Sequence, residues 1–115
     1  MAVERVTVLC ELPIEGFHQW PNAIDEVKFL KHPHRHTFVV RMAFGVTHDD
    51  RDKEIFILRD MIRRFIGKHY GSPAQFGPMS CESIARILLE QFRNMDAVWC
   101  EVWEENTGGA RIDAL

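Results

Sequence analysis

Hydrophobic and polar residues alternate in three segments of the chain, and this two-residue period predicts β-strands. The segments are Val3–Leu12, His34–Thr47 and Asp96–Glu104, and in each the even-numbered positions form the more apolar face. Glu105–Gly109 has the composition of a hairpin turn, so Ala110–Leu115 is expected to return as a fourth strand.

Between these strands, apolar residues recur at the spacing of two amphipathic helices. The first is predicted over Glu54–Ile66 with Gly67 as its stop, and the second begins after Ser80 as N-cap. Pro13–Pro33 is expected to be a long irregular connection, and Gly71–Met79 a loop. The order β-β-α-α-β-β predicts an α+β fold, an antiparallel four-stranded sheet with both helices on one face.

Composition narrows the function. A chain of 115 residues with 46% hydrophobic residues is expected to form a single domain over residues 1–115. The net charge of −3, without a basic stripe, argues against a nucleic-acid partner. No apolar run is long enough for a membrane span or a secretion signal, so no membrane partner is expected. Three cysteines without CxxC spacing favour a reducing, cytoplasmic location.

The histidines carry the first sign of chemistry, since His32, His34 and His36 fall within five residues. Residues at i and i+2 of a strand share one face, so the last two side chains can reach one metal ion. Catalytic zinc takes three protein ligands and leaves a position open. His18 is the natural third ligand, whereas His48 lies roughly 40 Å along the strand at about 3.3 Å per residue. The alternative is a pair of surface histidines without a metal.

These residues resemble a known family. Phe17–Pro21 followed by His34–His36 resembles the zinc motif of the 6-pyruvoyl-tetrahydropterin synthase family, which includes the bacterial 6-carboxytetrahydropterin synthases. Met79–Ala85 is similar to the family's helix start. Val102–Glu104, followed by Gly109, resembles the strand whose glutamate anchors the pterin ring. The four motifs occur in order along nearly the whole chain.

The resemblance implies a T-fold and a zinc-dependent carbon–oxygen lyase that acts on dihydroneopterin triphosphate or a related pterin. It implies three Zn²⁺ ligands: His18, His34 and His36. Glu104 would hold the ring by accepting two parallel N–H bonds, with Ser80 and Cys81 in contact with the ring. Zinc would stabilise the charge that develops on deprotonation of a carbon acid. Family members form rings, so a homohexamer built as a dimer of trimers is expected.

The sequence also departs from the family pattern. Leu30 stands where the family carries its catalytic cysteine, and Arg35 replaces the glycine between the paired histidines. His69 matches the histidine of the family's catalytic Asp-His pair, but no aspartate precedes it. Two residues are candidates for the missing base: His32, because it lies in the ligand segment and histidine is a common general base, and Cys81, because a helix N-terminus favours a thiolate.

Two other functions stay open. A diverged T-fold protein would keep the pocket and bind a pterin- or purine-like ring with different or no catalysis. A small structural zinc domain is disfavoured, because three histidines leave a coordination position open. Glu104 and Glu105 have the alternative interpretation of a solvated turn. Trp99 and Trp103 share the other sheet face and are expected to form an oligomer contact or to cover that face.

Overall fold

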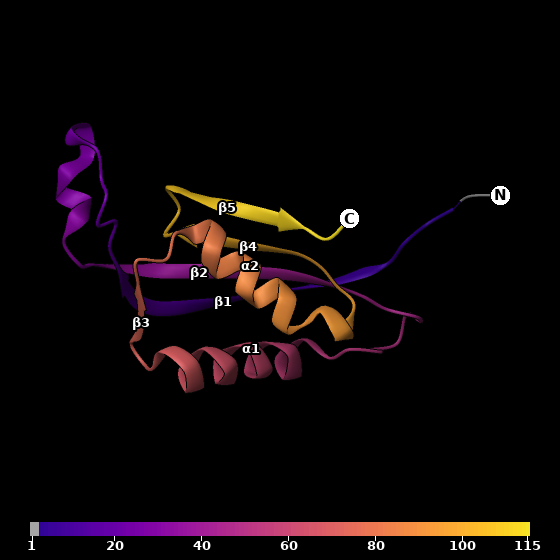
Figure 1. The fold of residues 1–115 in the computed structure, drawn as a ribbon. Coiled ribbons are helices and arrows are strands. Elements are labelled where there is room, and N and C mark those ends of the chain that lie inside the picture. Colours follow the sequence, from indigo (N-terminus) through magenta and orange to yellow (C-terminus); the bar gives the residue numbers. More distant parts are fainter. Residues whose placement is uncertain (1–2) are drawn as a thin grey trace.

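A mixed β-sheet forms the centre of the molecule (Figure 1). The computed structural model describes residues 3–115. Within those residues it contains five strands: β1 (Thr7–His18), β2 (His34–Gly45), β3 (Ala74–Gly77), β4 (Ala97–Glu104) and β5 (Gly108–Asp113). Their order is β3-β1-β2-β4-β5, and all neighbours are antiparallel except β1 and β3. The predicted α+β class is confirmed. The predicted antiparallel four-stranded sheet is wrong, because a fifth strand, β3, pairs in parallel with β1 at the edge of the sheet.

The additional strand, β3, lies in the segment that was predicted to be a loop. It is four residues long and pairs with the end of β1, where Gly16 lies opposite Ala74. A Cβ on Gly16 would lie 3.0 Å from the Ala74 carbonyl oxygen, so glycine permits the close approach. A strand this short between prolines has no detectable periodicity, and its pairing depends on tertiary contacts that the local sequence does not encode.

Strand β1 continues beyond its predicted end at Leu12. Pro13 pairs with Val39 of β2, while β3 covers only the last residues of β1. The other edge of β1 is therefore unpaired at Pro13. Proline has no backbone N–H, and at an unpaired edge its absence removes no hydrogen bond between strands. The extension matters for function because it carries the chain as far as His18, directly opposite His34.

Two α-helices among the described residues, α1 (Ile55–Tyr70) and α2 (Cys81–Gln91), pack on the same face of the sheet. Their buried residues join the even-numbered strand positions in one core, which includes Leu12, Phe38 and Ile62. This confirms the prediction of both helices on one face. No helix within residues 3–115 is both long and apolar enough to cross a membrane.

The helix ends differ in how well the sequence indicates them. Ser80 caps α2 as predicted, since its Oγ accepts a hydrogen bond from the Ser83 backbone N–H at 3.1 Å. Helix α1 runs past its predicted stop at Gly67 and ends at Gly71, where φ is 89°. A glycine inside a helix costs only about 1 kcal/mol, whereas positive φ at the terminus favours glycine.

The connection between β1 and β2 forms an arm that projects beyond the end of the sheet (Figure 1). We call residues 19–33 the arm. It contains the 3₁₀ helix η1 (Asp25–Lys31), where an irregular connection was predicted. A second 3₁₀ turn, η2 (Arg93–Met95), leads into β4. The predicted hairpin between β4 and β5 is confirmed.

The sheet face opposite the helices is covered by charged side chains. The Arg41 guanidinium lies 5.3 Å from the centre of the Trp103 ring, and that of Arg111 lies 4.2 Å from the Trp99 ring. Both guanidinium groups approach the Glu101 carboxylate, at 3.7 and 3.2 Å. The indoles are thus shielded within one chain by cation–π contacts, and their expected role in an oligomer contact stays a prediction.

Candidate metal centre and adjoining cavity

Three histidines converge where β1 ends and β2 begins. His18 and His34 are paired across the two strands, and His36 follows on the same face of β2. One ring nitrogen from each lies within 4.8 Å of the other two. Nitrogens bound to one tetrahedral zinc ion, at about 2.0–2.1 Å, would be about 3.3–3.4 Å apart. The predicted group can therefore hold a metal ion after a small contraction.

The other nitrogen of each ring is held by an oxygen atom. The Nδ1 contacts are His18 to the Met79 carbonyl at 3.0 Å, His34 to the His32 carbonyl at 2.9 Å, and His36 to the Glu105 carboxylate at 2.7 Å. Because these partners are acceptors, each Nδ1 carries a proton and donates it. In the neutral ring, Nε2 then has a lone pair, and this is the tautomer that a metal ligand needs.

The lone pairs meet in a buried place. Within residues 3–115, the Nε2 atoms of His18 and His36 are buried without a hydrogen-bond partner. Burial lowers the pKa of His18, and the hydrogen bond to Met79 and the charge of Glu104 only partly oppose that shift. The neutral imidazole is therefore favoured. Buried acceptors without a partner are unfavourable, and a bound cation would satisfy both.

Buried core side chains pack against these rings and fix their orientation. Phe38 is fully buried, and its ring lies 5.1 Å from that of His18 and 5.5 Å from that of His36. Phe76 of β3 packs against Phe38 at 5.1 Å. The edge strand thus supports the cluster through Phe76, in addition to the Met79 carbonyl that follows it. This is the packing that preorganises a ligand set.

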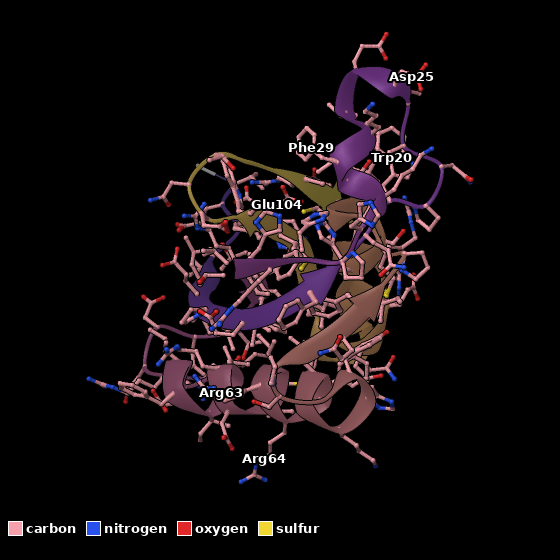
Figure 2. All side chains as sticks on the ribbon, turned by 90° about the vertical axis from the view of Figure 1, so that its left-hand side faces the viewer. Trp20, Asp25, Phe29, Arg63, Arg64 and Glu104 are labelled. Atoms are coloured by element: carbon pink, nitrogen blue, oxygen red, sulfur yellow. The ribbon has the colours of Figure 1, made fainter. Side chains whose placement is uncertain are left out.

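A cavity of about 410 Å³ opens beside the histidines. Residues from the arm, the start of α2 and the β4–β5 hairpin line it with the cluster, among them Trp20, Leu30, His18, His34, Ser80, Cys81, Glu104 and Gly109. In Figure 2 the arm rises above Glu104 and carries Trp20 and Phe29. The volume is at the lower end of the range for small-molecule sites, about 300–1,000 Å³.

Glu104 joins the cavity to the histidine cluster. Its Oε2 lies 3.0 Å from His18 Nε2, and its Oε1 lies 3.6 Å from His36 Nε2. The Cys81 thiol donates to the same carboxylate at 3.9 Å. The interpretation as a solvated turn holds for the position of Glu105, which is exposed in the turn after β4, but Glu104 ends the strand and both carboxylates contact the histidine cluster.

Cys81 lines the cavity, but not in the state that the sequence predicted. Burial raises the pKa of its thiol to about 12, and the neighbouring Glu104 and Glu82 carboxylates contribute. The expected stabilisation of a thiolate by the helix N-terminus is outweighed, so Cys81 is a protonated donor at neutral pH. Ser80 also lines the cavity while its Oγ caps α2.

The other two candidate catalytic residues lie elsewhere. His32 is exposed, and it contributes its backbone carbonyl to orient His34. His69 is exposed near the end of α1 and packs on Phe65, with 4.4 Å between the ring centres. Among residues 3–115, the lining of the cavity includes neither side chain. One chain therefore brings Cys81, but not His32 or His69, to the cavity.

Glu105 belongs to the candidate site, although the sequence did not indicate it. Its carboxylate accepts from His36 Nδ1 and, at 3.2 Å, from the Thr37 backbone N–H. Its backbone has φ of 50°, which turns the side chain back toward β2. The signal in the sequence was an acidic residue directly after a strand, and it became meaningful only once β4 was known to pair with β2.

Comparison with known proteins adds no family to this description. The sequence matches no protein-family model and no curated protein. The function is therefore inferred from the residues and the geometry of the site.

Proposed function

We propose that this protein is a zinc-dependent lyase of the 6-pyruvoyl-tetrahydropterin or 6-carboxytetrahydropterin synthase type, which eliminates triphosphate from dihydroneopterin triphosphate or acts on a related pterin. The observation that carries the proposal is the juxtaposition of three Nε2 lone pairs with a cavity that contains a carboxylate. A substrate oxygen would bind at the metal, and a flat heterocycle would bind in the cavity at the carboxylate. One substrate that has both groups therefore needs the two features side by side. The T-fold that the sequence resemblance implies is part of the same proposal.

The residues of the chain would divide the work. Glu104 would accept two N–H groups from the ring, which fixes both its position and its orientation. Gly109, which also lines the cavity, allows β5 to approach β4 closely, since a Cβ there would lie 2.3 Å from the Val102 carbonyl oxygen. Zinc would act as a Lewis acid toward the side-chain oxygens of the substrate and stabilise negative charge. The Cys81 thiol would hold Glu104 by its S–H donor.

A second candidate is a diverged protein that binds such a ring with different or no catalysis. Leu30, at the position where the resemblance expects a cysteine, lines the cavity and offers no base. The protonated Cys81 does not replace it. In the assembly that we propose, a homohexamer formed as a dimer of trimers in the cytoplasm, another subunit would have to supply the base.

Turnover of dihydroneopterin triphosphate by purified, zinc-loaded protein tests the proposal. We expect triphosphate release by the wild type, its loss in His34→Ala, and no change in the control His48→Ala, whose exposed side chain pairs with Asp52. Binding of the ring without release of triphosphate would select the diverged protein. Zinc-dependent folding without ring binding would indicate a structural zinc domain.

A further inference from the structure

Glu104 occupies a place that an acceptor should avoid. Its oxygens lie 3.0 and 3.6 Å from the Nε2 atoms of His18 and His36. When the rings are neutral, with their Nδ1 protons donated to Met79 and Glu105, these contacts join oxygen lone pairs to nitrogen lone pairs. Lone pairs that face each other repel, unless a cation lies between them.

We propose that Glu104 is the fourth ligand of the metal in the substrate-free protein, and that it leaves the metal when a ring enters the cavity. Nitrogen and oxygen ligands of a tetrahedral zinc ion, at about 2.0–2.2 Å, lie about 3.4 Å apart. Each Glu104 oxygen lies near that separation from one ring nitrogen, Oε2 at 3.0 Å from His18 and Oε1 at 3.6 Å from His36. The inference rests on the metal centre of the proposed function and adds a ligand exchange to it.

The surroundings of Glu104 allow this exchange, and those of Glu105 do not. The Glu104 side chain borders the cavity, and its donor besides the histidine contacts is the Cys81 thiol at 3.9 Å. The Glu105 carboxylate is held by His36 and by the Thr37 backbone, at 2.7 and 3.2 Å. Of the two neighbouring carboxylates, one is fixed as a support for a ligand and the other is free to change partner.

The exchange makes ring binding and metal binding interdependent. A ring that takes Glu104 removes a ligand from the metal, and the side-chain oxygens of a full substrate would replace it. A bare pterin ring without such oxygens removes the ligand and replaces nothing. Because the two binding equilibria are linked, the bare ring and zinc should each weaken the binding of the other by the same factor.

Zinc affinity, measured by chelator competition without substrate, tests the inference. We expect Glu104→Gln to weaken zinc binding by about 10-fold or more, since changes even in outer-shell residues cost about 10–100-fold. Glu82→Gln is the matched control, because Glu82 also lines the cavity but has no close contact with the histidines among the described residues. Circular dichroism would verify that both variants fold.

The cobalt-loaded wild type gives a second readout that needs no variant. Its visible absorption spectrum should change when bare pterin is added, and zinc affinity should fall at the same time. Unchanged zinc affinity in Glu104→Gln, with an unchanged cobalt spectrum on addition of pterin, would overturn the inference and leave the histidine site intact. Failure of the wild type to bind zinc would overturn the proposed metal centre itself.

Discussion

The open face of the sheet and the histidine cluster both gather polar side chains, but they satisfy their acceptors differently. On the open face, the Glu101 carboxylate lies between the guanidinium groups of Arg41 and Arg111. At the cluster, the Glu104 carboxylate faces ring nitrogens whose protons are on the far side of the ring. The first region is electrostatically complete within the chain. The second brings acceptors together in a way that a bound cation would satisfy.

This difference separates a surface network from a site. Charged groups are common on protein surfaces, and exposed ion pairs contribute little to stability. What distinguishes the cluster, among residues 3–115, is that the Nε2 atoms of His18 and His36 are buried without a hydrogen-bond partner.

The reactivity of Cys81 reports how strongly burial and the Glu104 carboxylate raise the pKa of its thiol. With a pKa of about 12 in place of 9.0, the thiolate fraction at pH 8 is about 1000-fold lower than for an ordinary thiol. We expect native, metal-free protein to resist alkylation by iodoacetamide at pH 8, as followed by intact mass. Glu104→Gln should increase the rate, because it removes one cause of the raised pKa. Rapid labelling of the wild type would restore Cys81 as a candidate base.

Removal of one imidazole should greatly weaken the binding of zinc by the histidine cluster. We expect His34→Ala to lower zinc affinity by more than about 100-fold, beyond the usual effect of outer-shell changes. Wild-type protein at a free zinc concentration 100 times its Kd should gain about 2.7 kcal/mol of stability, which a chelator removes. Thermal unfolding measures both effects, with His48→Ala as control. A variant that kept the zinc-dependent stabilisation would contradict the ligand assignment.

Glu105 tests whether the support behind a ligand matters. We expect Glu105→Gln to lower zinc affinity by about 10–100-fold, because a neutral amide holds the His36 Nδ1–H less strongly than a carboxylate. Competition with a chelator measures this loss. Glu15→Gln is a control from the same end of the sheet, where Glu15 pairs with Arg35 and Thr37. Equal affinity of the two variants would argue against a role for Glu105.

The open face should respond least. We expect Arg111→Ala to lower the free energy of unfolding by about 1 kcal/mol or less, the size of an exposed cation–π contact and an exposed ion pair. Urea unfolding measures this, and zinc affinity should not change. Arg64→Ala, which breaks an exposed pair with Asp60 on α1, provides the control. A loss of zinc binding in Arg111→Ala would show that the two regions are coupled.

The sequence indicated the ligand histidines because their signal is local. His34 and His36 share a face by the strand period alone, and Phe17–His18 stands out in an otherwise weakly patterned segment. The α2 cap was equally local, since Ser80 precedes an apolar helical stripe. These features need no knowledge of which strand lies beside which.

The missed features all depend on pairing. Strand β3 is held by Gly16 and by the end of β1, and its own four residues give no periodic signal. Glu105 reaches His36 because β4 lies next to β2, in a register that puts Glu104 opposite Phe38. The state of Cys81 depends on burial and on Glu104, both of which arise from tertiary structure. Local propensity therefore indicated the candidate ligands, whereas tertiary packing determines the chemical environment of the site.

The pairing of His18 with His34 has a mechanical consequence for the arm between them. A metal ion bound to both would cross-link the chain at the two points where the arm leaves the sheet, and so close residues 19–33 into a ring. Closing such a loop restricts the conformations available to it. Zinc would then hold the two ends of the arm together, and slower amide exchange along the arm would report that the metal is bound.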